Sequence, residues 1–325
     1  MTLPRRKFLR LAAAAAAVLA VPRIAWAQAY PSRPVRLIVG FPAGGQIDII
    51  ARLVGQWLSD RLGQQFYIDN RPGAASNVAA EAVVRAPADG LTLFLANGTN
   101  AVNASLYDNL RFDFLRDTEP VASINRIPLL LYAHPSFEPK TVADLIAYAK
   151  ANPGKLSIAT PPKGTGPSMA AELFKLTADI DVVVVRYRAD AQVVTDLLGG
   201  QVPVAFGGIS PVIPHVKAGK LRALGVTVAE RLSELPDVPR IADTLAGFEA
   251  SGWCGIVAPR NTPLEIVDKL HGEINAALAD PNMVARLAEA GVTILSLSRE
   301  GFGKFIAQET GKWGKVIRAA NIKPD

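Results

Sequence analysis

The chain has 325 residues, of which 50% are hydrophobic and 20% charged, and it contains one cysteine. This composition excludes an intrinsically disordered chain, a collagen-like repeat and a disulfide-stabilised scaffold. Lysine and arginine number 35 against 29 acids, and this formal charge of +6 would by itself favour a nucleic acid or an anionic membrane as partner.

Residues 1–27 are typical of an export signal that is cleaved after Ala27. A basic segment starting at Arg5 precedes an alanine-rich run over 11–21, which is too short to span a bilayer. Arg5 to Arg10 resembles a twin-arginine motif, although the usual Ser or Thr before the arginine pair is missing. The signal holds five basic residues and no acid, so the rest of the chain is left with a charge of only +1. We therefore predict a periplasmic protein that does not bind nucleic acid.

Alternating strand and helix patterns follow the signal. Short apolar runs predict strands at 35–41, 66–68 and 91–95, and helical spacing of apolar residues predicts helices at 50–58 and 75–85. Such alternation predicts a parallel sheet covered by helices on both faces.

The pattern restarts after about residue 126. Thr141 and Asp144 predict a capping box at the start of a helix. Further strands are expected at 129–132, 156–159, 182–185, 202–206 and 221–226, and two helical stripes at 264–278 and 302–317. We therefore predict two α/β lobes that form a cleft. Residues 28–125 plus 250–325 make up lobe 1, and 126–249 make up lobe 2. Ligands of open α/β sheets bind at the carboxyl ends of strands.

The sequence contains no recognisable catalytic, cofactor or metal motif. The only histidines, His134, His215 and His271, are scattered, and no G-x-S-x-G nucleophile pattern occurs. Gly164-Thr165-Gly166 lacks the third glycine of a dinucleotide fingerprint. Cys254 lies in an apolar segment and is interpreted as a buried strand thiol. We expect no catalytic residue, no cofactor and no bound metal.

Two glycine-containing loops between a strand and a helix could hold an anion. The first runs from Phe41 to Asp48, where glycines allow close backbone approach and the helix start presents free N–H groups. A plain turn, with Asp48 as a first-turn helix acid, explains this pattern equally well. The second runs from Lys163 to Ser168, where Thr165 or Ser168 can donate a hydroxyl.

Two further segments supply polar groups near strand ends. Asn97 to Asn100 follows a predicted strand, and Arg186 and Arg188 flank Tyr187 after another. An arginine there could pair with a ligand carboxylate. Asp190 could instead neutralise Arg188 in a structural ion pair.

The ordered set of motifs along the chain resembles the Bug family, the extracytoplasmic solute receptors of tripartite tricarboxylate transporters. These motifs are residues 30–34 (YPSRP), 41–45 (FPAGG), 69–74 (DNRPGA), 103–107 (NASLY), 195–202 (TDLLGGQV), 217–224 (KAGKLRAL), 235–239 (LPDVP) and 258–263 (APRNTP). The resemblance implies a type II periplasmic-binding-protein fold, with two α/β lobes that close around a carboxylated ligand. It also implies ligand contacts through Ala43, Gly44, Asp48, Thr99, Thr165, Gly166 and Ser168. To these we add Phe41, Gln46, Lys163, Arg188 and Gly207 as candidate ligand-binding residues.

Three positions depart from the family pattern. Ile47 replaces a small hydroxyl residue, Arg188-Ala189-Asp190 replaces a Lys-Gly-small sequence, and Gly207-Gly208 replaces an Asp-Asn-like pair. Loss of these side chains predicts a roomier pocket, suited to a bulkier or aromatic acid at least as well as to a C4 diacid.

Three functions remain in competition. The favoured one is a monomeric periplasmic receptor that captures an organic carboxylate and delivers it to the membrane permease subunits of such a transporter. A carboxylate sensor that presents its closed form to a membrane signalling partner is the alternative. An exported enzyme is favoured only by the twin-arginine signal.

Overall fold

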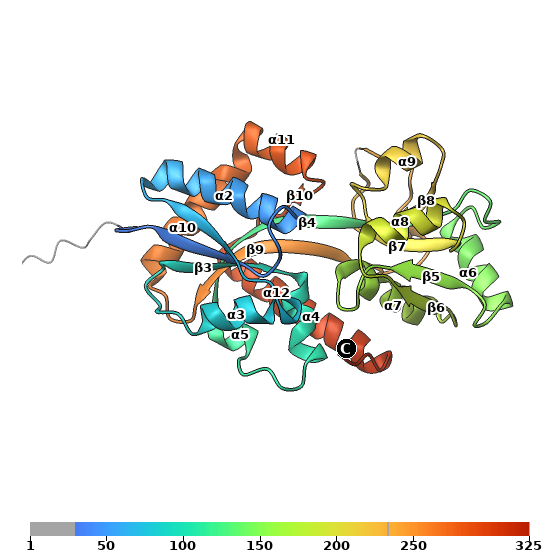
Figure 1. The fold of residues 1–325 in the computed structure, drawn as a ribbon, viewed down its shortest axis with the longest axis horizontal. Helices are drawn as coiled ribbons and strands as arrows, with labels where there is room; N and C mark the ends of the chain where they lie inside the picture. Colours follow the sequence, from blue (N-terminus) through green and yellow to red (C-terminus); the bar gives the residue numbers. More distant parts are fainter. Residues whose placement is uncertain (1–29, 233, 325) are drawn as a thin grey trace, which may run out of the picture.

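The computed structural model describes residues 30–232 and 234–324, so the predicted signal and its cleavage site lie outside the described residues. Figure 1 shows two α/β lobes side by side, one built from the beginning and end of the chain and the other from its middle. The α/β class predicted from the sequence is confirmed. Within the described part of the chain, no helix is both long and apolar enough to cross a bilayer.

Three parallel strands form one edge of the first lobe. They are β1 (Val35–Val39), β2 (Phe66–Asn70) and β3 (Thr92–Asn97), in the order β2-β1-β3. The connecting helices are α2 (Gln46–Leu62) and α3 (Asn77–Val84), the latter preceded by a 3-10 turn, η1 (Ala74–Ser76). The apolar side chains of β1 are fully buried, as expected for a strand covered on both faces.

Two antiparallel strands connect the lobes. β4 (Thr118–Ala133) pairs with β9 (Ser251–Pro259) over 118–128 and with β7 (Val204–Gly208) over 129–133. Only the end of β4 was predicted as a strand, because its first part acquires hydrogen-bond partners from β9, which is distant in sequence. Since β9 also runs antiparallel to β3, the sheet of the first lobe is mixed, and the expectation of a parallel sheet is wrong there.

The change of partner along β4 bears on the division into lobes. β4 leaves β9 after Pro128 and joins β7 from Leu129, and β9 starts at Ser251. The predicted limits at residues 126 and 250 stay a prediction.

The second lobe continues the sheet in the order β4-β7-β5-β6. Its elements are β5 (Ser157–Thr160), β6 (Val183–Arg186), β8 (Arg222–Val226), α6 (Val142–Ala151), α7 (Gly166–Ala178), α8 (Asp190–Leu198), α9 (Ile213–Lys217) and a 3-10 turn, η2 (Ile241–Asp243). The predicted capping box at α6 is confirmed, because the Asp144 N–H donates to Thr141 Oγ1 and the Thr141 N–H donates to the Asp144 carboxylate.

Helices cover both faces of the first lobe. The remaining elements are α4 (Gly98–Leu106), α5 (Phe114–Asp117), α10 (Leu264–Ala279), α11 (Pro281–Glu289), β10 (Thr293–Ile294) and α12 (Arg299–Ala319). Figure 1 shows α2, α10 and α11 on one face and α3, α4, α5 and α12 on the other. One apolar core joins Phe302 and Trp313 of α12 to Phe174 of the second lobe. The two lobes therefore share a continuous core on the α12 side.

Candidate ligand-binding site

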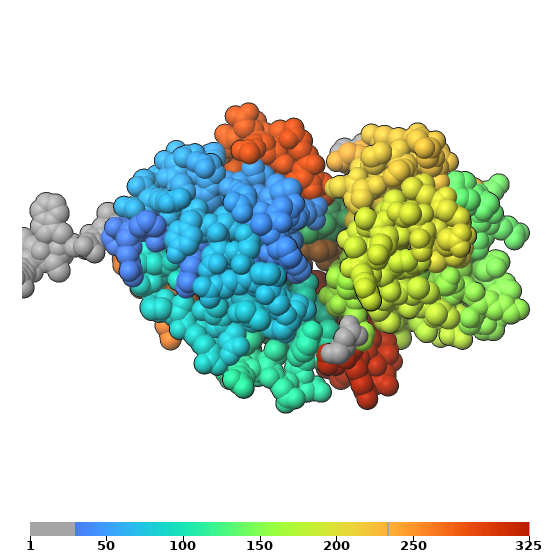
Figure 2. Space-filling view, viewed as in Figure 1, coloured from blue at the N-terminus to red at the C-terminus, as the bar shows by residue number. Residues whose placement is uncertain are grey.

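A cavity of about 350 Å³ lies between the lobes, and Figure 2 shows the groove that separates them. Its lining residues are Phe41, Gln46, Ile47, Asn97, Gly98, Thr99, Val102, Ile127, Leu129, Pro161, Pro162, Thr165, Gly166, Pro167, Met169, Arg188, Ala189, Asp190, Gly208, Ser251, Gly252, Trp253 and Trp313. Apolar side chains and backbone dominate this lining, and the charged members are Arg188 and Asp190.

The topology explains why these residues meet. Segments that follow β1, β3, β5 and β6 all reach the cavity, so the carboxyl ends of these strands face it from both lobes. Helices α2, α4, α7 and α8 begin at the same place. The start of an α-helix carries N–H groups without helical partners and a partial positive charge. The cavity therefore has the backbone donors that an anion requires.

Asp48 shapes the first loop from inside. Its carboxylate accepts hydrogen bonds from the Gly44 N–H at 2.9 Å, from Arg52 Nε at 2.8 Å and from Asn70 Nδ2 at 3.0 Å. Asn70 Nδ2 also donates to the Phe41 carbonyl oxygen at 3.0 Å. Asp48 is 2% exposed and does not line the cavity. In this structure the carboxylate holds the loop that carries Phe41 and Gln46, and Asp48 lies in the first turn of α2, as the plain-turn interpretation has it.

The second loop also uses its polar groups internally. Thr165 lines the cavity, but its hydroxyl donates to the Pro162 carbonyl oxygen at 2.7 Å. In this arrangement the Thr165 hydroxyl hydrogen is already used, so it cannot donate to a ligand as we expected. Only the oxygen lone pairs of Thr165 remain available to a ligand. Ser168 is buried within α7, and neither Ser168 nor Lys163 is part of the lining.

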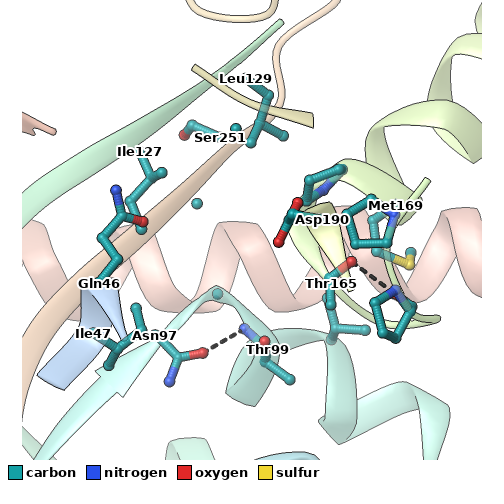
Figure 3. Close-up of a pocket in the computed structure, with 18 of the residues that line it drawn as sticks. Gln46, Ile47, Asn97, Thr99, Ile127, Leu129, Thr165, Met169, Asp190 and Ser251 are labelled. Carbon is teal, nitrogen blue, oxygen red and sulfur yellow. Dashed lines mark hydrogen bonds between the residues drawn. The ribbon is translucent and has the colours of Figure 1, made fainter. Parts of the chain in front are cut away.

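Two buried donors at the cavity have no hydrogen-bond partner among the described residues. They are Asn97 Nδ2 and Trp253 Nε1, on residues that are 4% and 0% exposed. Asn97 is held in place because its Oδ1 caps α4 by accepting from the Thr99 N–H at 3.0 Å (Figure 3). Trp253 is fixed by edge contacts with Phe302 and Phe305. Buried donors are nearly always satisfied in native proteins, so these two indicate a ligand or water site.

Charged groups of the second lobe lie at the opposite side of the cavity. The alternative of a structural ion pair is not seen, since no ion pair joins Arg188 to Asp190 in the part of the chain that is described. Arg186, by contrast, is paired with Glu172. Partial burial in the cavity wall raises the pKa of Asp190 above its ordinary value, although its own backbone N–H lowers it.

The cavity brings together half of the sequence-predicted ligand residues. Phe41, Gln46, Thr99, Thr165, Gly166 and Arg188 line it, whereas Ala43, Gly44, Asp48, Lys163, Ser168 and Gly207 do not. Gly207 faces Tyr132, and the neighbouring Gly208 lines the cavity in its place. The ligand contacts themselves stay a prediction.

Sequence reasoning missed the contribution of the connecting strands. Ile127 and Leu129 of β4, and Ser251 and Trp253 of β9, lie along the cavity. Their apolar surroundings in the sequence indicate buried core, and nothing local distinguishes core from cavity wall.

The interpretation of Cys254, next to Trp253, is confirmed: it is fully buried, and burial raises the pKa of its thiol to about 12. Within the described ranges, no three His, Cys, Asp or Glu side chains form a metal-ligand group.

Comparison with known proteins agrees with this geometry. A family model described as the tripartite tricarboxylate transporter family receptor matches residues 50–322. The chain belongs to this family. BugT of Bordetella pertussis, a relative of this receptor, is 33% identical over 300 residues, which cover 91% of this chain and 92% of BugT. The predicted resemblance to the Bug family is thus confirmed.

Solved structures of similar proteins extend the comparison. An R. palustris protein solved with adipate is 35% identical to this receptor, with a TM-score of 0.77 over 91% of this chain and 100% of that one. MatC from Rhodopseudomonas palustris, solved with bound malate, is 29% identical, with a TM-score of 0.73 over 89% and 100%. The predicted two-lobed periplasmic-binding-protein fold is confirmed.

Proposed function

We propose that this receptor captures a small organic carboxylate in the cavity between its lobes. The observation that carries the proposal is the pair of unpartnered buried donors, Asn97 Nδ2 and Trp253 Nε1, beside several helix starts. Leaving a buried donor unpaired costs about 1–3 kcal/mol, so an acceptor that enters the cavity recovers that energy. A carboxylate, with two oxygens and a full negative charge, fits such donors best.

The related structures support the same ligand class. They were solved with adipate and with malate, both of which are carboxylates. We further propose that the receptor works as a monomer in the periplasm and delivers its ligand to the permease subunits of a tripartite tricarboxylate transporter. Membership of that receptor family supports this partner.

Native mass spectrometry of the purified protein, exported in its own host, tests the ligand class. We expect a bound mass that matches an organic acid and that disappears on denaturation. A thermal-shift panel of C4 diacids, longer diacids and aromatic acids tests the pocket size, and we expect the longer and aromatic acids to stabilise at least as well as the C4 diacids. If no acid is retained and none in the panel raises the melting temperature, the proposed function is wrong.

A further inference from the structure

Asp190 places a carboxylate inside the proposed ligand cavity. It is the first residue of α8, and Figure 3 shows its side chain extending from the second lobe toward the centre of the cavity, opposite Gln46. Its carboxylate accepts no hydrogen bond from another side chain among the described residues, and no cation is paired with it there. The charge is therefore available to whatever occupies the cavity.

This carboxylate also changes what the start of α8 can bind. A helix start favours one negative charge, and at α8 that charge is supplied by Asp190 itself. A ligand carboxylate placed beside Asp190 would meet a like charge, and the two charges would repel each other. The α8 end of the cavity is therefore an acceptor site.

The opposite side of the cavity has the reverse character. Asn97 and Trp253 offer donors without partners, and α2 and α4 begin there. The two sides of the cavity thus differ. The first lobe offers donors and no acid, whereas the second lobe adds the one acid of the lining, Asp190, beside Arg188 and the start of α7. A ligand that fits both ends has an anionic group at one end and a donor group at the other.

We propose that Asp190 is a specificity-determining residue that selects a carboxylate bearing an amino or amide group at its far end and disfavours a dicarboxylate. The inference rests on the proposed function, since it assumes that one carboxylate binds on the first lobe. It separates this receptor from the two relatives solved with adipate and malate, both dicarboxylates.

Matched pairs of probes test the inference by isothermal titration calorimetry on the mature protein at pH 7. One pair is adipate and 5-aminopentanoate, which share a chain of four methylenes. The other is terephthalate and 4-(aminomethyl)benzoate, which share an aromatic ring. Because a hydrogen bond to a charged group is among the strong ones, we expect the amino acid of at least one pair to bind about tenfold or more tightly than its diacid.

The variant Asp190→Asn keeps the shape of the side chain and removes its charge, so it should abolish the tenfold preference. Glu138→Gln is the matched control, because Glu138 is an exposed carboxylate of the same lobe that lies outside the cavity. It should retain the wild-type preference. The wild-type comparison needs no variant and decides the inference even if Asp190→Asn does not fold.

The outcomes are distinguishable. Tighter binding of the diacids by the wild type, or an unchanged preference in Asp190→Asn, would overturn the inference and leave the proposed carboxylate receptor standing. Binding of none of the four acids would overturn the proposed function and the inference together.

Discussion

The role of Asp48 can be tested by a single isosteric change, Asp48→Asn. The buried carboxylate accepts from Gly44, Arg52 and Asn70, and the amide of asparagine has only one oxygen to replace two. At least one donor therefore faces an NH₂ group and loses its acceptor. A hydrogen bond to a charged group contributes about 1.5–3 kcal/mol. The Arg52 side chain is 55% exposed and can turn to water, so its hydrogen bond to Asp48 contributes less than about 1 kcal/mol to the free energy of unfolding.

We expect Asp48→Asn to lower the free energy of unfolding of the ligand-free protein by about 2–3 kcal/mol at pH 7, measured by urea denaturation. Asp60→Asn, an exposed change on the same helix, is the control and should fall within about 0.5 kcal/mol of wild type. A role confined to ligand binding would leave the ligand-free stability of Asp48→Asn unchanged, and that result would refute our reasoning.

The pH dependence gives a second check on Asp48. Burial raises the pKa of its carboxyl, but the hydrogen bonds from Arg52, Gly44 and Asn70 outweigh burial and hold the pKa below the ordinary 3.8. A lowered pKa means that the stabilisation is present above about pH 3.8 and is lost as the pH falls through the folded-state pKa. The difference between wild type and Asp48→Asn should therefore shrink over that range, and a constant difference would contradict this account.

Three more predictions concern the two lobes and the cavity. Gly291 has φ +75°, a left-handed conformation that a side chain disfavours, so Gly291→Ala should lower the free energy of unfolding by about 1–2 kcal/mol in urea denaturation, and an unchanged free energy would contradict this account. Trp253→Phe removes the Nε1 donor but keeps a ring against Phe302, so calorimetry should show affinity about tenfold lower; unchanged affinity would exclude Nε1 as a ligand donor. Burial raises the pKa of Asp190, which opposes folding once the carboxyl ionises. Asp190→Asn should therefore raise the melting temperature at pH 7, with the gain vanishing below about pH 3.8, and a gain that persists in acid would show another cause.

Local sequence patterns predicted the structural features that depend on contacts between residues near in sequence. The α6 capping box involves residues three apart, and the helix starts beside the cavity follow directly from strand-to-helix turns. The first part of β4 escaped prediction because it contains Pro120 and becomes a strand only through pairing with β9. The inward orientation of Asp48 depends on Asn70 from the next strand, which no spacing reveals.

The residues of the candidate site likewise divide into those that a local sequence pattern predicts and those that depend on contacts distant in sequence. The loops at Phe41 and Thr165 could be predicted, because glycine between a strand and a helix has a recognisable pattern. The unpartnered donor of Trp253 could not be predicted, because the position of this buried residue beside a cavity is set by how the lobes meet. The pattern around Asp190 indicates only a neighbour that could neutralise Arg188, whereas no ion pair joins the two among the described residues.

The paired strands β4 and β9 also determine how the receptor can deform. Because they hydrogen-bond to each other where they leave the first lobe, any opening of the lobes must bend them together as a ribbon. Sliding β4 along β9 by a single residue would turn every side chain of that strand to the wrong face. Translation of one strand along the other is therefore excluded, and the lobes can move only by rotation. The shared core around Trp313 resists separation on the α12 side. The lobes can therefore separate more readily on the α11 side, where Gly291 lies close to Ser210.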